Sequence, residues 1–430
     1  MRPLAVPHGW AWPGEREASA WLTGLGLVSG DRIAFGGLNN DNTVQFLAAA
    51  LRLGLTVIPL NRRLMIGELQ ALHRRAKVRH TIADPAHPLA SAVAITALPT
   101  VFRGEAGTGG PLTGSLVLFT SGSTGAAKAV RLGPMALVAA ITAHVAALDL
   151  ASSDSWSLPL PLDHVGGIMA TLRALHCGYA IVLEATPAPD ATGVSIVPTM
   201  LKRLVDAETA PPRLLRVALT GGGPLDPHLA ERARALGWPV RETYGLTEMG
   251  SMVTLDGLPV PSAQIRIADG RILVDGPMRC DGYEHDGVLS PISGWHATGD
   301  CGELVDGRLL VTSRVSELIV SGGENVAAVE VENALLAHPL VADAGVVGLP
   351  DAHWGEIVAA AVVLRQGLTL SQLDAWLAPR IAGFKRPRRC IVVDALPRSS
   401  LGKLQRHTLQ AMFANSSPVG DGDAALRVRS

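Results

Sequence analysis

The segment Thr120-Ser121-Gly122-Ser123-Thr124-Gly125-Ala126-Ala127-Lys128 follows directly on the apolar run Leu116–Thr120. The run predicts a buried strand that opens into a loop rich in glycine and hydroxyl side chains. Glycines let the backbone approach an anion closely, hydroxyls donate to phosphate oxygens, and Lys128 adds a positive charge. The GxxxxGK[ST] spacing of a Walker loop is absent from the chain. Serine and glycine alone suit a surface turn equally well, but the preceding strand and Lys128 favour a phosphate-binding loop.

Two further apolar runs end at turn residues. Val194–Val197 precedes Pro198, and Leu215–Thr220 precedes Gly221-Gly222-Gly223. A helix is expected over 199–207, behind the proline. Short apolar runs that alternate with helical segments are typical of an α/β protein with mostly parallel sheets.

The pattern changes from about Gln264, where short strands separated by glycine turns predict a β-rich module. After Arg314 it predicts a small α+β domain of about 100 residues. We therefore expect a large domain over 1–314, a small domain over 315–414 and a disordered polar tail over 415–430. The expected strands in this half are 265–267, 271–274, 302–305, 308–312, 318–320, 344–347 and 358–364, and the expected helices are 326–337 and 370–377.

Composition excludes several classes of protein. Of 430 residues, 48% are apolar and 17% charged, which is enough for large cores and excludes global disorder. Lys and Arg number 37 against 38 Asp and Glu, so nucleic acid or a membrane surface is not bound through bulk charge. The four cysteines form no CxxC pair, and we find neither a signal-peptide core nor an apolar run of about 20 residues. We expect a cytoplasmic protein and leave a homo-oligomer open.

Four more motifs follow the loop in a fixed order: Tyr244-Gly245-Leu246-Thr247-Glu248, Thr298-Gly299-Asp300, the stretch Arg314–Glu330 and Pro397–Lys403. Together the five resemble the phosphate loop, YGxTE, TGD, hinge and PxxxxGK motifs of the acyl-adenylate-forming (AMP-binding) superfamily. That superfamily includes acyl- and aryl-CoA synthetases, adenylation domains and luciferases. The resemblance implies a large domain of parallel-rich sheets with a β-rich module, and a small mobile α+β domain.

The resemblance also implies the site residues. An aromatic ring at Tyr244 can stack on adenine, and the carboxylate of Glu248 suits Mg²⁺. Alone, Glu248 would be read as a solvated turn residue, Asp300 as an Asx turn cap, Arg314 as a surface arginine and Lys403 as a solvated lysine. Lys403, Lys128 and His164 are the expected catalytic residues. The expected nucleotide-binding residues are Thr120, Ser121, Gly122, Ser123, Thr124, Gly125, Lys128, Gly221, Gly222, Gly223, Tyr244, Gly245, Thr247, Asp300 and Arg314.

A finer resemblance concerns the acid that is activated. Leu158–Gly167, Ser195–Leu201 and Gly221–Pro224 are most similar to bacterial o-succinylbenzoate–CoA ligases, which activate a menaquinone precursor. It implies that His164 lines or gates the acyl pocket, although a lone histidine is more often structural. The expected pocket residues are His164, Gly166, Gly167, Pro198, Thr199 and Gly222, and the expected hinge and thiol-channel residues are Ser316, Gly322 and Gly323.

The chain departs from the family pattern at several positions. Ala127 and Ala129 flank Lys128 where proline and glycine are usual, and Asp163 replaces an aromatic residue before His164. Ser313 stands where glycine is usual before the hinge arginine. The family match also begins closer to the start of the chain than usual, so the large domain is expected to be N-terminally shortened.

These residues predict an acid–CoA ligase that uses ATP, Mg²⁺ and coenzyme A. A carboxylate would first form an acyl-adenylate, and rotation of the small domain about Ser316 would then admit the thiol. The basic cluster Lys385–Arg389 is expected either to meet CoA phosphates or to be a solvated charge run. Three alternatives stay open: a ligase for another aryl or fatty acid, an adenylation enzyme that loads a carrier protein, and a non-catalytic acyl-adenylate-binding protein.

Overall fold

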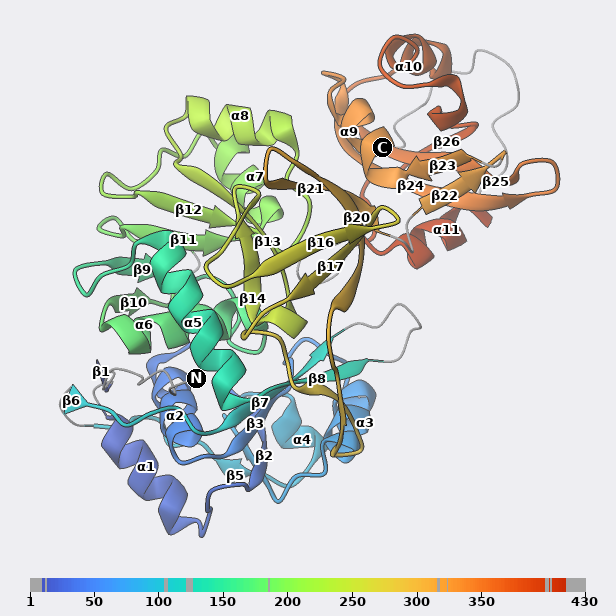
Figure 1. Cartoon of the computed structure of the whole chain (residues 1–430). Coiled ribbons are helices and arrows are strands. Elements are labelled where there is room, and N and C mark those ends of the chain that lie inside the picture. The colour runs from blue at the N-terminus through green and yellow to red at the C-terminus, as the bar shows by residue number, and fades with distance from the viewer. Residues whose placement is uncertain are drawn as a thin grey trace. The chain divides into compact units, whose positions relative to one another are not determined.

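The computed structural model describes residues 10–11, 14–103, 107–120, 127–184, 186–314, 318–322, 324–398, 402 and 404–414 (Figure 1). The chain divides into one compact unit of residues 1–225, 229–265 and 274–296, and a second of residues 226–228, 266–273 and 297–430. Residues 297–314, which the sequence assigned to the large domain, group with the second unit because β21 (Arg308–Arg314) lies against α9 (Ala328–Leu336). The tail 415–430 lies outside the described residues.

A seven-stranded sheet forms one half of the first unit. Its order is β10 (Ala180–Val182), β9 (Ser155–Ser157), β11 (Gly193–Ile196), β12 (Val217–Thr220), β13 (Val240–Leu246), β14 (Ser251–Leu255) and β15 (Leu258–Pro259). The pairs from β10 to β13 are parallel, and those from β13 to β15 are antiparallel. The central parallel strands β11 and β12 are buried along their whole length, and the parallel pairing confirms the α/β pattern predicted from the sequence.

An eight-stranded sheet forms the other half. Its order is β19 (Val288–Pro291), β18 (Gly282–His285), β8 (Lys128–Leu132), β7 (Ser115–Thr120), β3 (Thr56–Pro59), β2 (Arg32–Gly36), β4 (His80–Ala83) and β5 (Thr96–Ala97). The strand predicted before the glycine-rich loop is β7, and β8 returns antiparallel to it. Lys128 is therefore the first residue of a strand, at the far end of a loop between two neighbouring strands. Two residues each of β1 (Trp10–Ala11) and β6 (Gly107–Thr108) form a separate pair.

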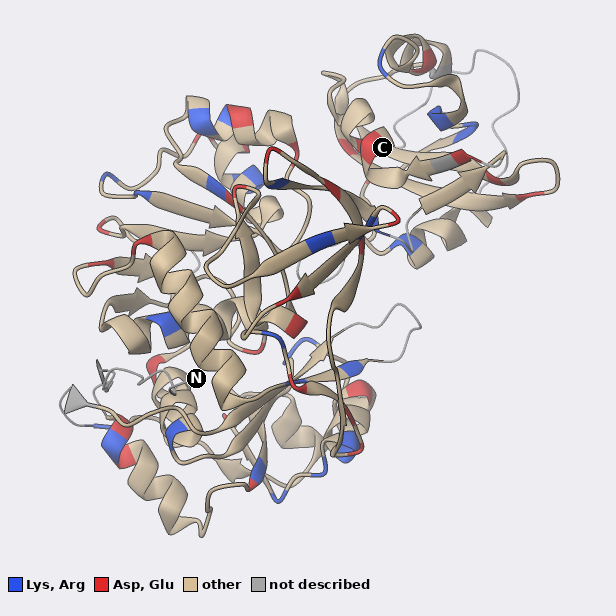
Figure 2. Cartoon of the chain, viewed as in Figure 1, with Lys and Arg blue, Asp and Glu red and all other residues tan. Residues whose placement is uncertain are grey.

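Helices cover both sheets of the first unit. On the seven-stranded sheet, Leu201 and Val205 of α7 (Pro198–Asp206) pack with Leu229 and Ala233 of α8 (Pro227–Ala235) against β11, β12 and β13. The uncharged helix α5 (Pro134–Leu148) packs on α6 (Val165–Cys177) and β14 (Figure 2). The remaining helices are α1 (Glu15–Gly24), α2 (Asp41–Arg52), α3 (Ile66–Ala76), α4 (Leu89–Ala92) and the 3₁₀ turn η1 (Thr247–Met249).

The second unit contains two sheets. The first has the order β16 (Gln264–Ala268), β17 (Arg271–Asp275), β20 (His296–Val305) and β21. The second has β23 (Glu324–Ala327), β22 (Leu318–Ser321), β25 (Gly355–Leu364) and β24 (Val341–Asp351), with β26 (Arg389–Val392) beside β25. Alternate residues of β25 face two cores, so that α9 and α10 (Leu370–Leu377) cover one face and α11 (Arg406–Ala414) the other. A 3₁₀ turn, η3, spans Gly383–Lys385.

Two local expectations were wrong. The helix predicted over 326–337 begins only at Ala328, because Val326 and Ala327 pair with Ile319 and Leu318 in a β-hairpin. Asp300, expected at a turn after Gly299, lies inside β20 opposite Arg314. Among the described residues, no helix is long and apolar enough to cross a membrane.

Candidate active site

Four parallel strands of the seven-stranded sheet end at one edge. The strands β9, β11, β12 and β13 are neighbours and run in the same direction, so the segments that follow them meet beyond their carboxyl ends. His164 follows β9, Pro198 and Thr199 follow β11, and Gly221–Gly223 follow β12. Tyr244–Glu248 end β13 and enter η1. The structure thus gathers the predicted acyl-pocket residues and part of the predicted nucleotide residues at this edge.

Glycines in these segments keep the backbones close together. A Cβ atom at Gly221 would lie 2.5 Å from Cγ2 of Thr243, and one at Gly245 would lie 1.8 Å from the carbonyl oxygen of Ser251. Gly222 has φ +82°, a conformation that favours glycine. A β-bulge between Tyr244 and Gly245 turns the end of β13. Side chains at Gly221 or Gly245 would therefore push apart the loops that form this edge.

Lys128, Glu248 and Tyr283 form a group where the two sheets meet. The hydroxyl of Tyr283 donates to Oε1 of Glu248 at 3.0 Å, and Nζ of Lys128 lies 5.6 Å from the centre of the Tyr283 ring. The pKa of Tyr283 is raised, mainly by burial and then by the charge of Glu248 and the hydrogen bond to it. The Tyr283 hydroxyl therefore keeps its proton and remains a donor at neutral pH. The sequence analysis missed Tyr283. Tyr283 is one of only three tyrosines in the chain, and this scarcity could have marked it as a candidate site residue.

The surroundings of Glu248 suit a magnesium ligand. Its carbonyl oxygen accepts the backbone N–H of Cys280 at 2.7 Å, and burial raises the pKa of the Cys280 thiol to about 12. Burial also lowers the pKa of His296, an effect that the charge of Glu248 opposes. Within the described residues no cluster of three or more His, Cys, Asp or Glu is present. Mg²⁺ is commonly held by one or two carboxylates together with substrate phosphates, and Glu248 fits that type of site.

His164 caps the start of α6 and contacts the other sheet. Its Nε2 atom lies 2.9 Å from Nδ2 of Asn61, which follows β3. Asn61 accepts the N–H of Arg63 on its Oδ1 atom, so its amide group donates to His164. Oδ1 of Asp163 lies 3.5 Å from the same Nε2 atom; it is buried and has no hydrogen-bond partner in the described part of the chain. The Asp163 carboxylate thus points toward His164. The contact from Asn61 was not predicted from the sequence.

Asp300 and Arg314, two of the expected nucleotide-binding residues, lie in the second unit. Nε of Arg314 is 3.0 Å from Oδ1 of Asp300, and the two residues are cross-strand partners in β20 and β21. The Asp300 side chain is 8% exposed, against 55% for Arg314. The hydroxyl of Thr298 accepts a hydrogen bond from the backbone N–H of Asp300 and donates one to the carbonyl oxygen of Ile272 at 3.0 Å. The TGD motif is therefore held rigidly within a sheet.

The small β-hairpin of the second unit carries Gly322. Its N–H donates to the carbonyl of Trp354 at 2.9 Å, and its φ is +62°. The Trp354 ring lies 4.1 Å from Cζ of Arg388. In the nearby basic cluster, Lys385 pairs with Glu330, Arg386 pairs with Asp374, and Arg389 donates to the carbonyl of Phe413. Two cations of the cluster are thus already paired with carboxylates. Of the other predicted residues, Ser121–Gly125, Ser316, Gly323 and Lys403 lie outside the described residues.

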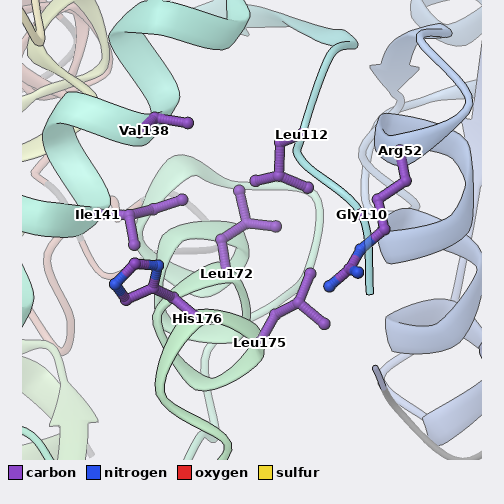
Figure 3. Close-up of a pocket in the computed structure, with 8 residues that line it drawn as sticks. All are labelled: Arg52, Gly110, Leu112, Val138, Ile141, Leu172, Leu175 and His176. Carbon is purple, nitrogen blue, oxygen red and sulfur yellow. The ribbon is translucent and has the colours of Figure 1, made fainter. Parts of the chain in front are cut away.

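A small pocket elsewhere in the first unit is a separate feature. It lies among α2, α5 and α6 and contains none of the predicted site residues (Figure 3). Its lining is mostly leucine, valine and isoleucine, with Arg52 and His176 as the charged or titratable members. Arg52 is held there by Glu15, 3.0 Å from its Nε atom. The pocket does not belong to the candidate active site.

The chain is similar to known proteins both in sequence and in fold. The chain is 33% identical to the 2-succinylbenzoate–CoA ligase of Bacillus velezensis over an alignment of 431 positions, gaps included, that covers 90% of this chain and 88% of that protein. The o-succinylbenzoate CoA synthetase MenE of Bacillus subtilis, solved in complex with the acyl-adenylate intermediate OSB-AMP, has a TM-score of 0.81 and 28% identity, and the match covers 92% of this chain and 91% of that one. The same enzyme in complex with ATP and magnesium ion has the same TM-score and identity, with coverages of 92% and 93%.

Two family models match successive parts of the sequence. Residues 330–403 match the AMP-binding enzyme C-terminal domain. Residues 16–283, more than half of the chain, match the family described as AMP-binding enzyme. This chain belongs to the AMP-binding enzyme family.

Proposed function

We propose that the chain is an AMP-forming acid–CoA ligase that activates o-succinylbenzoate for menaquinone biosynthesis. The observation that carries the proposal is the gathering of Lys128, Glu248 and the Gly221–Gly223 turn in one unit, together with the segments predicted to form the acyl pocket. The choice of o-succinylbenzoate as the acid substrate rests on the names of the relatives. Because ATP and CoA are the co-substrates, we expect the reaction in the cytoplasm.

The first step forms an acyl-adenylate. A carboxylate oxygen of the acid attacks the α-phosphorus of ATP, the new O–P bond forms, and the bond to the β-phosphate breaks to release pyrophosphate. Negative charge grows on the transferring phosphoryl group, so catalysis is mainly alignment and charge neutralisation. Lys128 would supply positive charge at the end of the phosphate loop and Lys403 would supply it from the second unit. When bound at Glu248, Mg²⁺ would neutralise phosphate charge.

The second step transfers the acyl group to a thiol. The CoA sulfur attacks the activated carbonyl, a C–S bond forms, and AMP leaves with the electron pair of the C–O bond. We propose that the domain from residue 315 onward moves about Ser316 between the steps, so that Lys403 withdraws and the Gly322–Gly323 hairpin serves the thiol. The backbone of Gly322 suits such a channel, because a Cβ atom there would lie 2.7 Å from the Trp354 ring.

The pairing of the cations in the basic cluster supports one of them as the contact for CoA phosphates. Lys385 and Arg386 are already bound to Glu330 and Asp374. Arg388 instead lies on the face of Trp354, and its charge is one of the minor causes that lower the pKa of Asp351. A cation on an aromatic face keeps its N–H donors for an anion. We propose Arg388 as the phosphate contact of this cluster. The Arg388→Gln variant should raise the KM for CoA and leave ATP–pyrophosphate exchange unchanged.

The test of the proposal is ATP–pyrophosphate exchange across a panel of carboxylic acids, followed by thioester formation with CoA. We expect o-succinylbenzoate to be used far better than benzoate or a medium-chain fatty acid. A site built for a second carboxylate leaves polar groups unsatisfied with a monoacid, at about 1–3 kcal/mol each. Comparable kcat/KM values would reject the substrate and keep the ligase. Exchange without consumption of free CoA would favour a carrier protein as acceptor, and no exchange with any acid would favour a non-catalytic binding protein.

A further inference from the structure

The side chain of Tyr283 interacts with both charged groups of the proposed phosphate and metal site, through its hydroxyl and through the face of its ring. Its hydroxyl donates to Oε1 of Glu248 at 3.0 Å, and its ring centre lies 5.6 Å from Nζ of Lys128. Lys128 lies on β8, Tyr283 on β18 and Glu248 on η1, so three separate segments of the first unit meet at this tyrosine. The carboxylate contacts one end of the side chain and the cation lies over its ring.

The backbone holds Tyr283 in this position. It is the cross-strand partner of Val130 in β8, and Lys128, two residues earlier on that strand, projects from the same face as Val130. On the other side β19 pairs with β18. Gly282 has φ +155°, and a Cβ atom there would lie 2.1 Å from the carbonyl oxygen of Ser290, so the residue next to Tyr283 has to be glycine at this spacing of β18 and β19. The buried His296 ring packs 6.5 Å from that of Tyr283.

We propose that Tyr283 is a positioning residue for Mg·ATP: it keeps Lys128 and Glu248 apart and orients the Glu248 carboxylate. This inference rests on the proposed function. A lysine and a glutamate that share a site would pair with each other, and the pair would compete with phosphate for the cation and with the metal for the carboxylate. The intervening ring attracts the ammonium group by its face. Its hydroxyl occupies Oε1, which leaves Oε2 and the remaining lone pairs for a metal.

Two variants separate the two parts of this role. Tyr283→Phe keeps the ring and removes the hydroxyl, so Mn²⁺ affinity in the presence of ATP, measured by electron paramagnetic resonance on the full chain, should fall about tenfold. Binding of metal-free ATP, measured by calorimetry, should not change. Tyr283→Leu also removes the ring, so Lys128 and Glu248 can pair, and metal-free ATP should bind about threefold more weakly as well.

The control is Tyr179→Phe. Tyr179 is fully buried and donates to the carbonyl of Ala170 at 3.2 Å, so this variant loses a tyrosine hydrogen bond away from the proposed site and should keep both affinities. Unchanged Mn²⁺ affinity in Tyr283→Phe would overturn the orienting role, and unchanged metal-free ATP binding in Tyr283→Leu would overturn the spacing role. If Tyr283→Leu fails to fold, Tyr283→Met, which also lacks an aromatic ring, replaces it as the test of the spacing role, and Tyr283→Phe still tests the orienting role.

A reference variant distinguishes failure of this inference from failure of the proposed function. Glu248→Gln should weaken Mn²⁺ binding more than Tyr283→Phe does, because it removes the ligand charge itself. If Glu248→Gln binds Mn²⁺ as the wild type does, the metal assignment of the proposed function is wrong. If Glu248→Gln is impaired and both Tyr283 variants match the wild type, only the role of Tyr283 is rejected.

Discussion

Asp300 and Arg314 face each other across two antiparallel strands, with Nε of Arg314 3.0 Å from Oδ1 of Asp300. The carboxylate is almost completely buried and the guanidinium is half-exposed. An arginine that presents its remaining donors to solvent beside a fixed carboxylate can bind neighbouring hydroxyl groups. The pair therefore suits the two hydroxyls of a ribose, the role that the family resemblance implies.

Asp300→Asn should mainly raise the KM for ATP, by about tenfold, because a ribose contact stabilises the ground state and the transition state alike. Steady-state kinetics with varied ATP measures this change. The matched control is Asp306→Asn, in the turn between β20 and β21, where φ is +48° and asparagine is tolerated. An unchanged KM for ATP in Asp300→Asn would remove this residue from the nucleotide site.

Lys403→Ala should reduce adenylation on the order of a hundredfold and spare thioester formation from supplied acyl-AMP. Lys403 lies outside the described residues, and Arg398 precedes it in the same motif. Arg398 pairs with Asp343 at 2.8 Å and donates to the carbonyl of Gly402 at 2.8 Å. Each half-reaction is measured separately, and the exposed Lys202→Ala variant is the control. Equal loss in both half-reactions would reject a mechanism with two domain orientations.

Local sequence predicted much of the fold, because the strand-forming runs are apolar and end at glycine or proline. The strands that end before residues 121, 198 and 221 were all located to within three residues. Asp300 was misplaced because Gly299, with φ +78°, has the local character of a turn, whereas the ladder to β21 accommodates it with a bulge at Cys301. Pairing with a distant strand overrides such local signals.

The contacts around the candidate site were harder to predict. Asn61 and His164 are 103 residues apart, and Tyr283 and Glu248 are 35 apart. Neither Asn61 nor Tyr283 belongs to a motif that the sequence analysis used, and only the packing of the two sheets brings them to their partners. The motif residues could be predicted because several of them occur at a recognisable local spacing in the sequence. A residue that supports the site needs only to lie near its partner in the folded chain, and local sequence does not show that.

Buried His144 should make the folded state sensitive to acid. Its Nε2–H donates to the carbonyl of Met252 at 2.9 Å, and burial, together with the charge of Arg173, lowers its pKa to about 3. In the unfolded chain a histidine titrates near 6.5, so between pH 6.5 and pH 3 the unfolded state binds more protons and the folded state loses stability as pH falls. This histidine alone accounts for about 2 kcal/mol between pH 7 and pH 5.

His144→Gln keeps an N–H donor for Met252 and does not titrate. The free energy of unfolding, from urea titrations at pH 7 and pH 5, should therefore fall by about 2 kcal/mol less in the variant than in the wild type. The exposed His228→Gln variant should follow the wild type. An identical loss in His144→Gln and the wild type would show that another group carries the acid sensitivity.

Asp163 should limit the use of a dianionic acid. Its side chain is 9% exposed, and its buried Oδ1 atom faces His164 at 3.5 Å, beside the segments assigned to the acyl pocket. A carboxylate there repels the second carboxylate of o-succinylbenzoate. Its buried oxygen also lacks a hydrogen-bond donor among the described residues, which destabilises the fold by about 1–3 kcal/mol. Asp163→Asn removes the charge and preserves the shape.

The variant should raise kcat/KM for o-succinylbenzoate by about tenfold relative to the wild type and leave that for benzoate unchanged, since only the dianion has a second charge to be repelled. The melting temperature should rise as well. The control is Asp190→Asn, a change at an exposed residue of the same unit. It should alter neither the ratio of kcat/KM for o-succinylbenzoate to kcat/KM for benzoate nor the melting temperature. If both acids gained equally in Asp163→Asn, the residue would act through the orientation of His164. If the ratio stayed the same with a raised melting temperature, Asp163 would be a structural residue and the selectivity for the acid would lie elsewhere in the pocket.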